Sequence, residues 1–168
     1  GLGHAGGLGY FPRARIIVSA QEWSMAMSGL GRFAHYPNSH WPKWLAPRMV
    51  TFNAGQMGNL SRSQPLTGDG AIYLVRTPGH TPGHISVVVE DAGLIYFFAG
   101  DASYLRATMA EAIADGVSAN PNIQIKTLKA IRDLAQSRPL IYLPTHDPDV
   151  ERRLAQRDRV DLGEVPAH

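Results

Sequence analysis

The stretch TPGHTPGHISVVVEDAGLIYFFAGDASY, residues 77–104, decides the fold. It repeats Thr-Pro-Gly-His, so that His80 and His84 stand four residues apart, and it continues through two apolar runs to Asp101. Both runs are rich in β-branched or aromatic residues, as strands are. The stretch therefore predicts two strands flanked by residue types that bind metals.

Working outward, further runs with strand composition lie on both sides. Residues 71–76 (AIYLVR), 85–90 (ISVVVE) and 94–99 (LIYFFA) predict three consecutive strands, and Asp-Ala-Gly at 91–93 predicts a hairpin turn. Residues 140–143 (LIYL) predict a last, buried strand before a proline.

Helical patterns alternate with these strands. Residues 15–20 predict a short strand, and QEWSMAMSGLG after it predicts a short helix ended by glycines. Asn120 and Pro121 form a good N-cap and first turn for an amphipathic helix over 121–136. The chain after Asp149 begins with a charged, helix-like piece.

Residues 32–70 give no sustained period, with four prolines and two tryptophans, and predict an irregular segment that can contain one short helix or strand. At 168 residues and 44% hydrophobic composition, the chain is expected to form a single domain. Interleaved strands and helices predict an α/β layered fold with its site along one edge of the sheets.

Composition excludes several classes of function. The 16 Lys and Arg residues are scattered and the net charge is only +2, so no nucleic-acid partner is expected. No cysteine is present, which leaves His, Asp and Glu as metal ligands. No apolar run is long enough to span a bilayer and no signal peptide is evident, so we expect no membrane partner and a cytoplasmic protein.

Ligand-type residues follow the predicted strands. His80 stands on a rigid turn after one strand, Asp101 follows an apolar strand, and His146 follows another. Taken alone, His80 is better explained as a turn histidine that bonds to the backbone, and for Asp101 a cap on the following segment is the less favoured alternative. A buried carboxylate needs a metal or several donors, however, and three such residues at three strand ends favour a metal site. His84, directly before a strand, is expected to support that site.

His4 precedes two glycines, which permit tight backbone turning near a ligand. Taken alone, a histidine so near a terminus is better explained as a surface residue. His35, His40 and His168 have no strand-end context.

The segments HAGGLGYFP, TPGHTPGHISVVVE, FAGDASY and YLPTHD resemble, in order and spacing, the later part of metallo-β-lactamase-fold hydrolases, in particular N-acyl homoserine lactonases. TPGHTPGH alone is shared with glyoxalase II, whereas its combination with Gly-Asp-Ala-Ser-Tyr and His-Asp points to lactonases. The resemblance implies an αββα sandwich, of which this chain would carry mainly the second half.

The resemblance also implies residue roles. His80 would bind a first metal, His4 and His146 a second, and Asp101 would bridge the two. Tyr104 would hydrogen-bond the substrate carbonyl. The metal would be zinc or another divalent transition metal, with one or two ions bound.

Other roles are assigned around this site. Asp147 is expected, with His84, to support the ligands. Trp41, Trp44 and Phe52 are candidates for the wall of a substrate pocket, although ordinary packing of their loop explains them equally well.

The family's His-x-His-x-Asp-His signature is incomplete here. If His4 is its last member, Gly3 stands at the aspartate and Gly1 at the second histidine. The second metal would keep His4, His146 and Asp101, whereas the first would keep two ligands. In relatives, protonation of the leaving group is commonly assigned to the signature aspartate, whose position is occupied by Gly3 here.

The implied function is hydrolysis of lactones or related esters by a metal-bound hydroxide, with a small-molecule substrate. Two alternatives stay open: a catalytically inactive remnant that binds a metal or a partner, and a phosphotriesterase or thioesterase of the same superfamily. Because the family's first-half strands would be largely missing, a sheet face or edge would need a cover, and we expect a homo-oligomer.

Overall fold

The structure is a computed structural model that describes residues 6–28 and 41–163. His4, at the incomplete signature, lies outside the described residues. The elements are, in order, η2 (Leu8–Tyr10), β1 (Ile17–Ser19), α1 (Ala20–Met27), β2 (Arg48–Val50), β3 (Gln56–Met57), β4 (Leu60–Ser61), β5 (Ile72–Arg76), β6 (Ile85–Asp91), β7 (Leu94–Gly100), α2 (Arg106–Ala110), α3 (Pro121–Ser137), β8 (Leu140–Pro144) and α4 (Val150–Gln156).

A four-stranded sheet in the order β5-β6-β7-β8 forms the body of the molecule. β5, β6 and β7 are antiparallel neighbours, and β8 pairs parallel to β7. β6 and β7 are joined by Ala92 and Gly93, both with positive φ, which is the backbone of a type I′ hairpin turn. The predicted hairpin is therefore confirmed.

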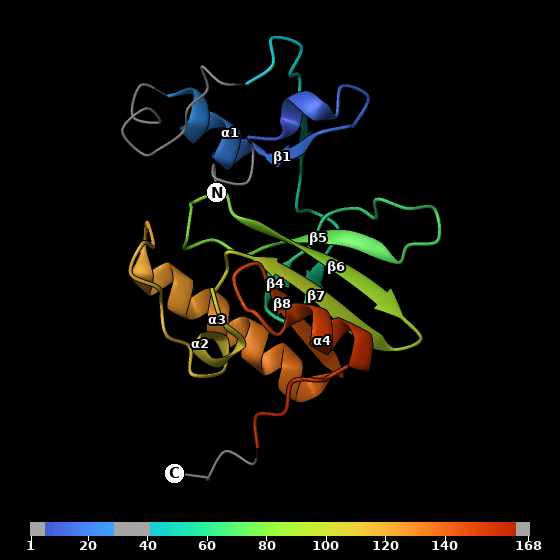
Figure 1. Ribbon diagram of the computed structural model, residues 1–168, viewed down its shortest axis with the longest axis vertical. Helices are drawn as coiled ribbons and strands as arrows, with labels where there is room; N and C mark the ends of the chain where they lie inside the picture. Colours follow the sequence, from blue (N-terminus) through green and yellow to red (C-terminus); the bar gives the residue numbers. More distant parts are fainter. Residues whose placement is uncertain (1–5, 29–40, 164–168) are drawn as a thin grey trace.

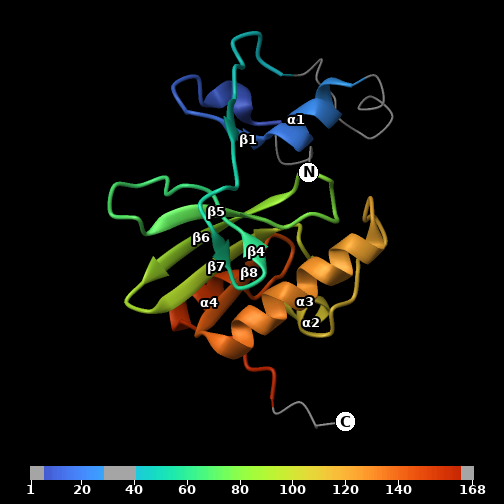
Figure 2. The same ribbon diagram turned by 180° about the vertical axis from the view of Figure 1, so that it is seen from behind.

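Helices cover both faces of this sheet. α3 lies on the face where Tyr73, Val88, Phe97 and Tyr142 are buried, and these residues form the main hydrophobic core with Leu128. α4 lies on the opposite face, where Val150 packs against a smaller cluster on β7 and β8. Figure 1 shows α4 in front of the sheet, and the reverse view in Figure 2 brings α3 to the front.

The N-terminal elements form a separate layer at one end of the sheet (Figure 1). β1 and β2 pair in parallel, with Ile17 opposite Arg48. Ser19 caps α1 by accepting a hydrogen bond from the Glu22 N–H at 3.1 Å, and its hydroxyl donates to the Gly83 carbonyl at 2.6 Å. This one side chain thus ties the N-terminal layer to the turn between β5 and β6.

Most predicted elements are confirmed within one or two residues, including the four strands of the main sheet, α3 with its Asn120 cap, and α4. The prediction for residues 32–70 needs correction, because the described part contains three short strands, β2, β3 and β4. Gly58 and the residue after it join β3 to β4 as a two-residue turn, a signal that the sequence contains. Among the described residues, no helix is both long and apolar enough to cross a membrane.

Candidate metal centre and adjoining cavity

The sheet topology gathers the candidate residues at one edge. The end of β5 lies beside the start of β6, because the two strands are antiparallel, and the end of β7 lies there for the same reason. β8 runs parallel to β7, so its end reaches the same edge. His80, His84, Asp101 and His146 follow or precede these strand ends, and residues far apart in the sequence therefore converge.

Asp101 stands at the centre of the site. Its side chain is 5% exposed, and its two oxygens face two different imidazoles. Oδ2 lies 3.4 Å from His80 Nε2, and Oδ1 lies 3.2 Å from His146 Nε2. A buried carboxylate with one imidazole at each oxygen supplies donor types that divalent transition metals bind.

The aromatic ring of Tyr104 lies against both histidines. Its centroid is 4.6 Å from that of His146 and 6.0 Å from that of His80. Burial raises the pKa of the Tyr104 hydroxyl, and the negative charges of Asp115 and Asp101 raise it further. The phenol therefore stays protonated at neutral pH and can donate a hydrogen bond next to the Asp101 carboxylate.

His84 lies behind this cluster rather than in it. The Asp101 backbone N–H donates to His84 Nε2 at 3.1 Å, so Nε2 carries no proton and Nδ1 must. Nδ1 lies 2.8 Å from the Thr77 hydroxyl, which lies 2.8 Å from the Ser86 hydroxyl. Ser86 donates to the Ala99 carbonyl at 3.1 Å, which completes a directed chain of hydrogen bonds.

Burial lowers the pKa of His84 to about 4, so the ring is neutral at physiological pH. Gly100, directly before Asp101, has a φ of +59°, and a Cβ there would lie 3.1 Å from His84 Nε2. The close approach of the histidine to the backbone thus depends on a glycine at this position.

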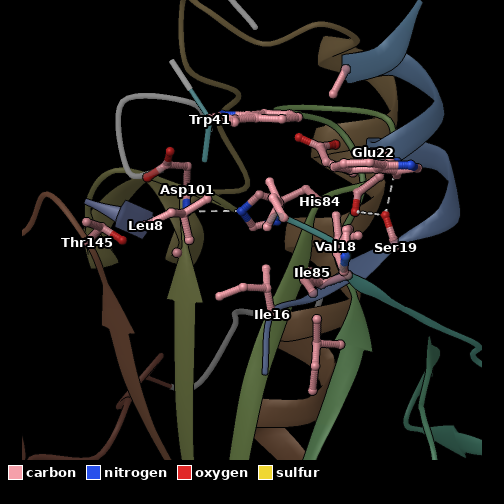
Figure 3. A pocket seen from close by; sticks show the side chains of 17 residues that line it. Leu8, Ile16, Val18, Ser19, Glu22, Trp41, His84, Ile85, Asp101 and Thr145 are labelled. Atoms are coloured by element: carbon pink, nitrogen blue, oxygen red, sulfur yellow. Dashed lines mark hydrogen bonds between the residues drawn. The ribbon is translucent and has the colours of Figure 1, made fainter. Parts of the chain in front are cut away.

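A cavity of about 390 Å³ adjoins the cluster, between the N-terminal layer and the sheet edge. Most of its wall is apolar, and its polar groups come from Ser19, Glu22, His84, Asp101 and Thr145 (Figure 3). Such a chamber suits a small ligand with an apolar part and a polar end that reaches Asp101.

The three aromatic candidates are divided by the structure. Trp41 lines the cavity (Figure 3), and its ring stacks on that of Trp23 with centroids 5.5 Å apart. Trp44 is 43% exposed, and Phe52 lies under the Arg76 guanidinium. Within the described part of the chain, neither Trp44 nor Phe52 belongs to the lining of this cavity.

The Asp147 carboxylate is hydrogen-bonded to neighbouring loops and helices rather than to His80, Asp101 or His146. Its Oδ2 accepts hydrogen bonds from Arg153 Nη1 at 2.6 Å and from the Arg106 backbone N–H at 2.9 Å. Its Oδ1 accepts from the Asp149 N–H at 3.0 Å. Asp147 therefore connects the loop after His146 to the start of α2 and to α4.

Sequence reasoning missed Asp115, whose Oδ1 lies 3.9 Å from His80 Nδ1. It also missed Gln124, a buried α3 residue that donates to Asp115 Oδ2 at 2.8 Å. Asp115 lies in an irregular segment with no strand-end or spacing signal. Gln124 carried one: it stands four residues before Leu128 on the buried stripe of a helix, where a polar side chain needs a partner.

The described residues fit part of a metal site. His80, Asp101 and His146 supply imidazole nitrogens and carboxylate oxygens of the kind that zinc and similar metals bind. Across residues 6–28 and 41–163, however, no three His, Asp or Glu side chains are already arranged around a common metal position. A ligand from outside these residues, or an adjustment of the three side chains, is needed to complete the site.

Comparison with known proteins places the chain in a family. A model of the metallo-beta-lactamase superfamily matches residues 2–146. An N-acyl homoserine lactonase of Rhizobium radiobacter is 27% identical over 154 residues, covering 88% of this chain and 55% of the lactonase. A probable metallo-hydrolase of Mycobacterium tuberculosis is 31% identical over 111 residues, covering 63% of this chain and 35% of that protein.

Solved structures agree on the fold. An N-acyl homoserine lactone hydrolase with the product N-hexanoyl-L-homoserine bound at its catalytic metal centre matches with a TM-score of 0.67 and 21% identity, over 88% of this chain and 53% of the other. A dizinc quorum-quenching lactonase matches with a TM-score of 0.52 and 15% identity, over 82% and 49% of the two chains. The chain spans about half the length of the relatives that it matches.

Proposed function

We propose that this chain, which belongs to the metallo-beta-lactamase superfamily, is a metal-dependent hydrolase. Its proposed reaction is the opening of lactones or the cleavage of related esters. The observation that carries the proposal is the buried Asp101 carboxylate between two imidazoles, with a tyrosine ring against both of them.

Each residue of the candidate site has a proposed role. Asp101, His80 and His146 would hold the metal, and His4, which lies outside the described residues, is proposed as a further ligand. When bound, a divalent metal supplies Lewis acidity that polarises a carbonyl and acidifies water. Tyr104 donates a hydrogen bond to the substrate carbonyl oxygen and stabilises the negative charge that develops there.

His84 keeps Asp101 in place without competing for the metal. As a neutral ring it accepts the Asp101 N–H, and its own N–H is bonded to Thr77. The carboxylate therefore starts from a backbone position that is already fixed, which is what a precise ligand requires.

The substrate class is proposed from the cavity and the relatives together. The cavity beside Asp101 has a largely apolar wall with Trp41 in it, which suits an acyl or other apolar group. A lactonase relative was solved with N-hexanoyl-L-homoserine, a ring-opened acyl product, at its metal centre. Acyl lactones are accordingly the first substrates to test.

Metal analysis and an activity panel test the proposal. Purified protein is reconstituted with Zn²⁺, Mn²⁺ or Co²⁺ and assayed on acyl lactones, aryl esters and phosphotriesters. We expect bound metal, turnover of lactones or esters, and loss of both metal and turnover in Asp101→Ala. Protein that binds no metal, or that turns over only phosphotriesters, contradicts the proposal.

We also propose that the chain forms a homo-oligomer. Val87 on β6 and Phe98 on β7 are cross-strand partners on the α4 face of the sheet, and they are 36% and 38% exposed. A second copy over this face would remove apolar surface from water. Size-exclusion chromatography with light scattering tests this, and Phe98→Ser should shift the mass toward the monomer. A monomeric wild-type protein at micromolar concentration contradicts it.

A further inference from the structure

Gln124 is a buried side chain that makes three hydrogen bonds close to the candidate metal centre. It is 1% exposed and lies in the first turns of α3. Its Nε2 donates to Asp115 Oδ2 at 2.8 Å and to the Ala102 carbonyl at 3.0 Å. Its Oε1 accepts the Asp115 backbone N–H at 3.3 Å. Both ends of Asp115 are therefore held by one amide, which is itself bonded to the residue after Asp101.

The remaining oxygen of Asp115 faces His80. Asp115 Oδ1 and His80 Nδ1 are 3.9 Å apart, and the two side chains are 10% and 12% exposed. Both atoms are buried, and among the described residues neither has a hydrogen-bond partner. Buried polar atoms are almost always paired. A small rotation of the imidazole would bring the two atoms into one hydrogen bond and satisfy both.

The backbone around His80 is fastened to the same region. The Ala119 N–H donates to the His80 carbonyl at 3.1 Å, and the Asn120 N–H donates to the Gly79 carbonyl at 3.0 Å. A Cβ on Gly79, whose φ is +140°, would lie 2.4 Å from the Gln124 Cα. The histidine turn and the start of α3 are thus packed at backbone contact, and the position of Asp115 relative to His80 is set by both.

We infer that Asp115, held by Gln124, is a positioning residue that keeps the ring proton of His80 on Nδ1 and leaves Nε2 available to a metal beside Asp101. His80 Nε2 already lies 3.4 Å from Asp101 Oδ2. A carboxylate that accepts the second N–H of a ligating histidine fixes its tautomer and orientation. The metal in this statement rests on the proposed function, whereas the Asp115–His80 hydrogen bond does not.

The hydrogen bond is tested on the metal-free protein. Long-range ¹H–¹⁵N correlation spectra at pH 8 report which ring nitrogen of His80 carries the proton. We expect the Nδ1–H form in the wild type and a shift toward Nε2–H in Asp115→Ala. Asp115→Asn is the milder second variant. Its single amide oxygen can accept from Gln124 on one side or from His80 on the other, but not from both. Asp133→Asn, an exposed aspartate on α3, is the matched control and should leave the His80 signals unchanged.

The consequence for metal binding is tested by titrating each variant with Co²⁺ and following its absorption spectrum. Loss of a group that orients a ligand typically weakens metal affinity by about 10- to 100-fold. We expect a loss in this range for both Asp115 variants and none for Asp133→Asn, with circular dichroism showing that each variant is folded.

An Nε2–H form of His80 in the wild type overturns the inference, and so do Asp115 variants with unchanged His80 signals and unchanged Co²⁺ affinity. If the wild type binds no Co²⁺, the proposed function fails, and the tautomer measurement alone then decides the inference. Reduced thermal stability without a change in His80 signals would assign Asp115 a purely structural role and would also overturn it.

Discussion

The two histidines of the repeated Thr-Pro-Gly-His have different surroundings although their local sequences match. His84 is 7% exposed, and its two ring nitrogens are hydrogen-bonded to Thr77 and to the Asp101 backbone N–H. His80 faces carboxylate oxygens with both of its ring nitrogens. The first histidine of the repeat is therefore the one that the proposed function uses as a metal ligand, whereas the second is hydrogen-bonded as a fixed support.

The buried neutral state of His84 predicts an acid-sensitive stability. Its pKa is about 4 in the folded protein against 6.5 for an ordinary histidine, so the unfolded chain binds more protons between these values. The free energy of unfolding of the metal-free protein should fall as the pH drops from about 6.5 to 4, by up to about 3 kcal/mol. Urea unfolding with EDTA at pH 7.5, 6 and 5 measures this. His84→Gln should flatten the dependence, and an equal slope in both proteins would refute the assignment.

Removal of the Tyr104 hydroxyl should affect turnover and spare metal binding. The ring that packs against His146 and His80 is kept in Tyr104→Phe, whereas the hydrogen-bond donor is lost. Removal of one such donor typically lowers kcat by about 10²- to 10³-fold. Steady-state kinetics on the best lactone or ester, with metal content measured in parallel, checks this. Tyr96→Phe, on β7, is the control and should retain activity.

At the scale of elements, α3 is the support of the candidate site. Its N-terminus carries Asn120, whose side chain accepts the Ile123 N–H at 3.0 Å. Farther along, the Thr127 hydroxyl donates to the Pro78 carbonyl at 2.6 Å. The turn that holds His80 is thus hydrogen-bonded to Asn120, the N-cap of α3, and to Thr127 within the helix, so the stability of that helix end should affect the histidine.

Loss of the α3 cap should therefore destabilise the protein measurably. Asn120→Ala removes the acceptor for the Ile123 N–H, and loss of an N-cap costs about 1 kcal/mol. Chemical denaturation should show this decrease in the free energy of unfolding. Asn122, the exposed second residue of α3, provides the matched control. Asn122→Ala should leave the free energy of unfolding unchanged. Equal stabilities of the two variants would contradict the capping role.

At the scale of the whole molecule, the candidate site lies where two layers meet. The N-terminal layer with α1 contacts the sheet edge through Ser19 and Gly83, and a Cβ on Gly83 would lie 2.2 Å from the Glu22 backbone nitrogen. The cavity beside Asp101 is lined from both layers, by residues such as Ile17 and Trp41 on one side and Ile85 on the other. A ligand in this region contacts both layers and should stabilise their association.

Metal removal should accordingly lower thermal stability. A metal that binds the folded chain and not the unfolded chain stabilises it by about 2.7 kcal/mol when its free concentration is 100-fold above Kd. We expect the Tm to fall on treatment with a chelator and to recover on addition of Zn²⁺ or Mn²⁺. Asp101→Ala should show neither change. A Tm that is indifferent to chelator in the wild type would contradict the metal site.

Local sequence determined the main sheet and its site-bearing ends. Runs rich in β-branched and aromatic residues predicted β5, β6, β7 and β8, and the Asn-Pro pair predicted the start of α3, because these signals depend on neighbours along the chain. α2 was missed: it has five residues, and its first N–H is held by Asp147, a contact that no local pattern contains.

The sequence by itself thus determined which residues stand at strand ends, since His80, Asp101 and His146 each follow an apolar run. Only the tertiary structure decided that these ends share one edge, because strand order and direction set which of them meet. The same is true of Asp115, which the α3 amide of Gln124 turns toward His80. Contacts of this kind depend on how distant segments pack, and a linear pattern carries no record of that packing.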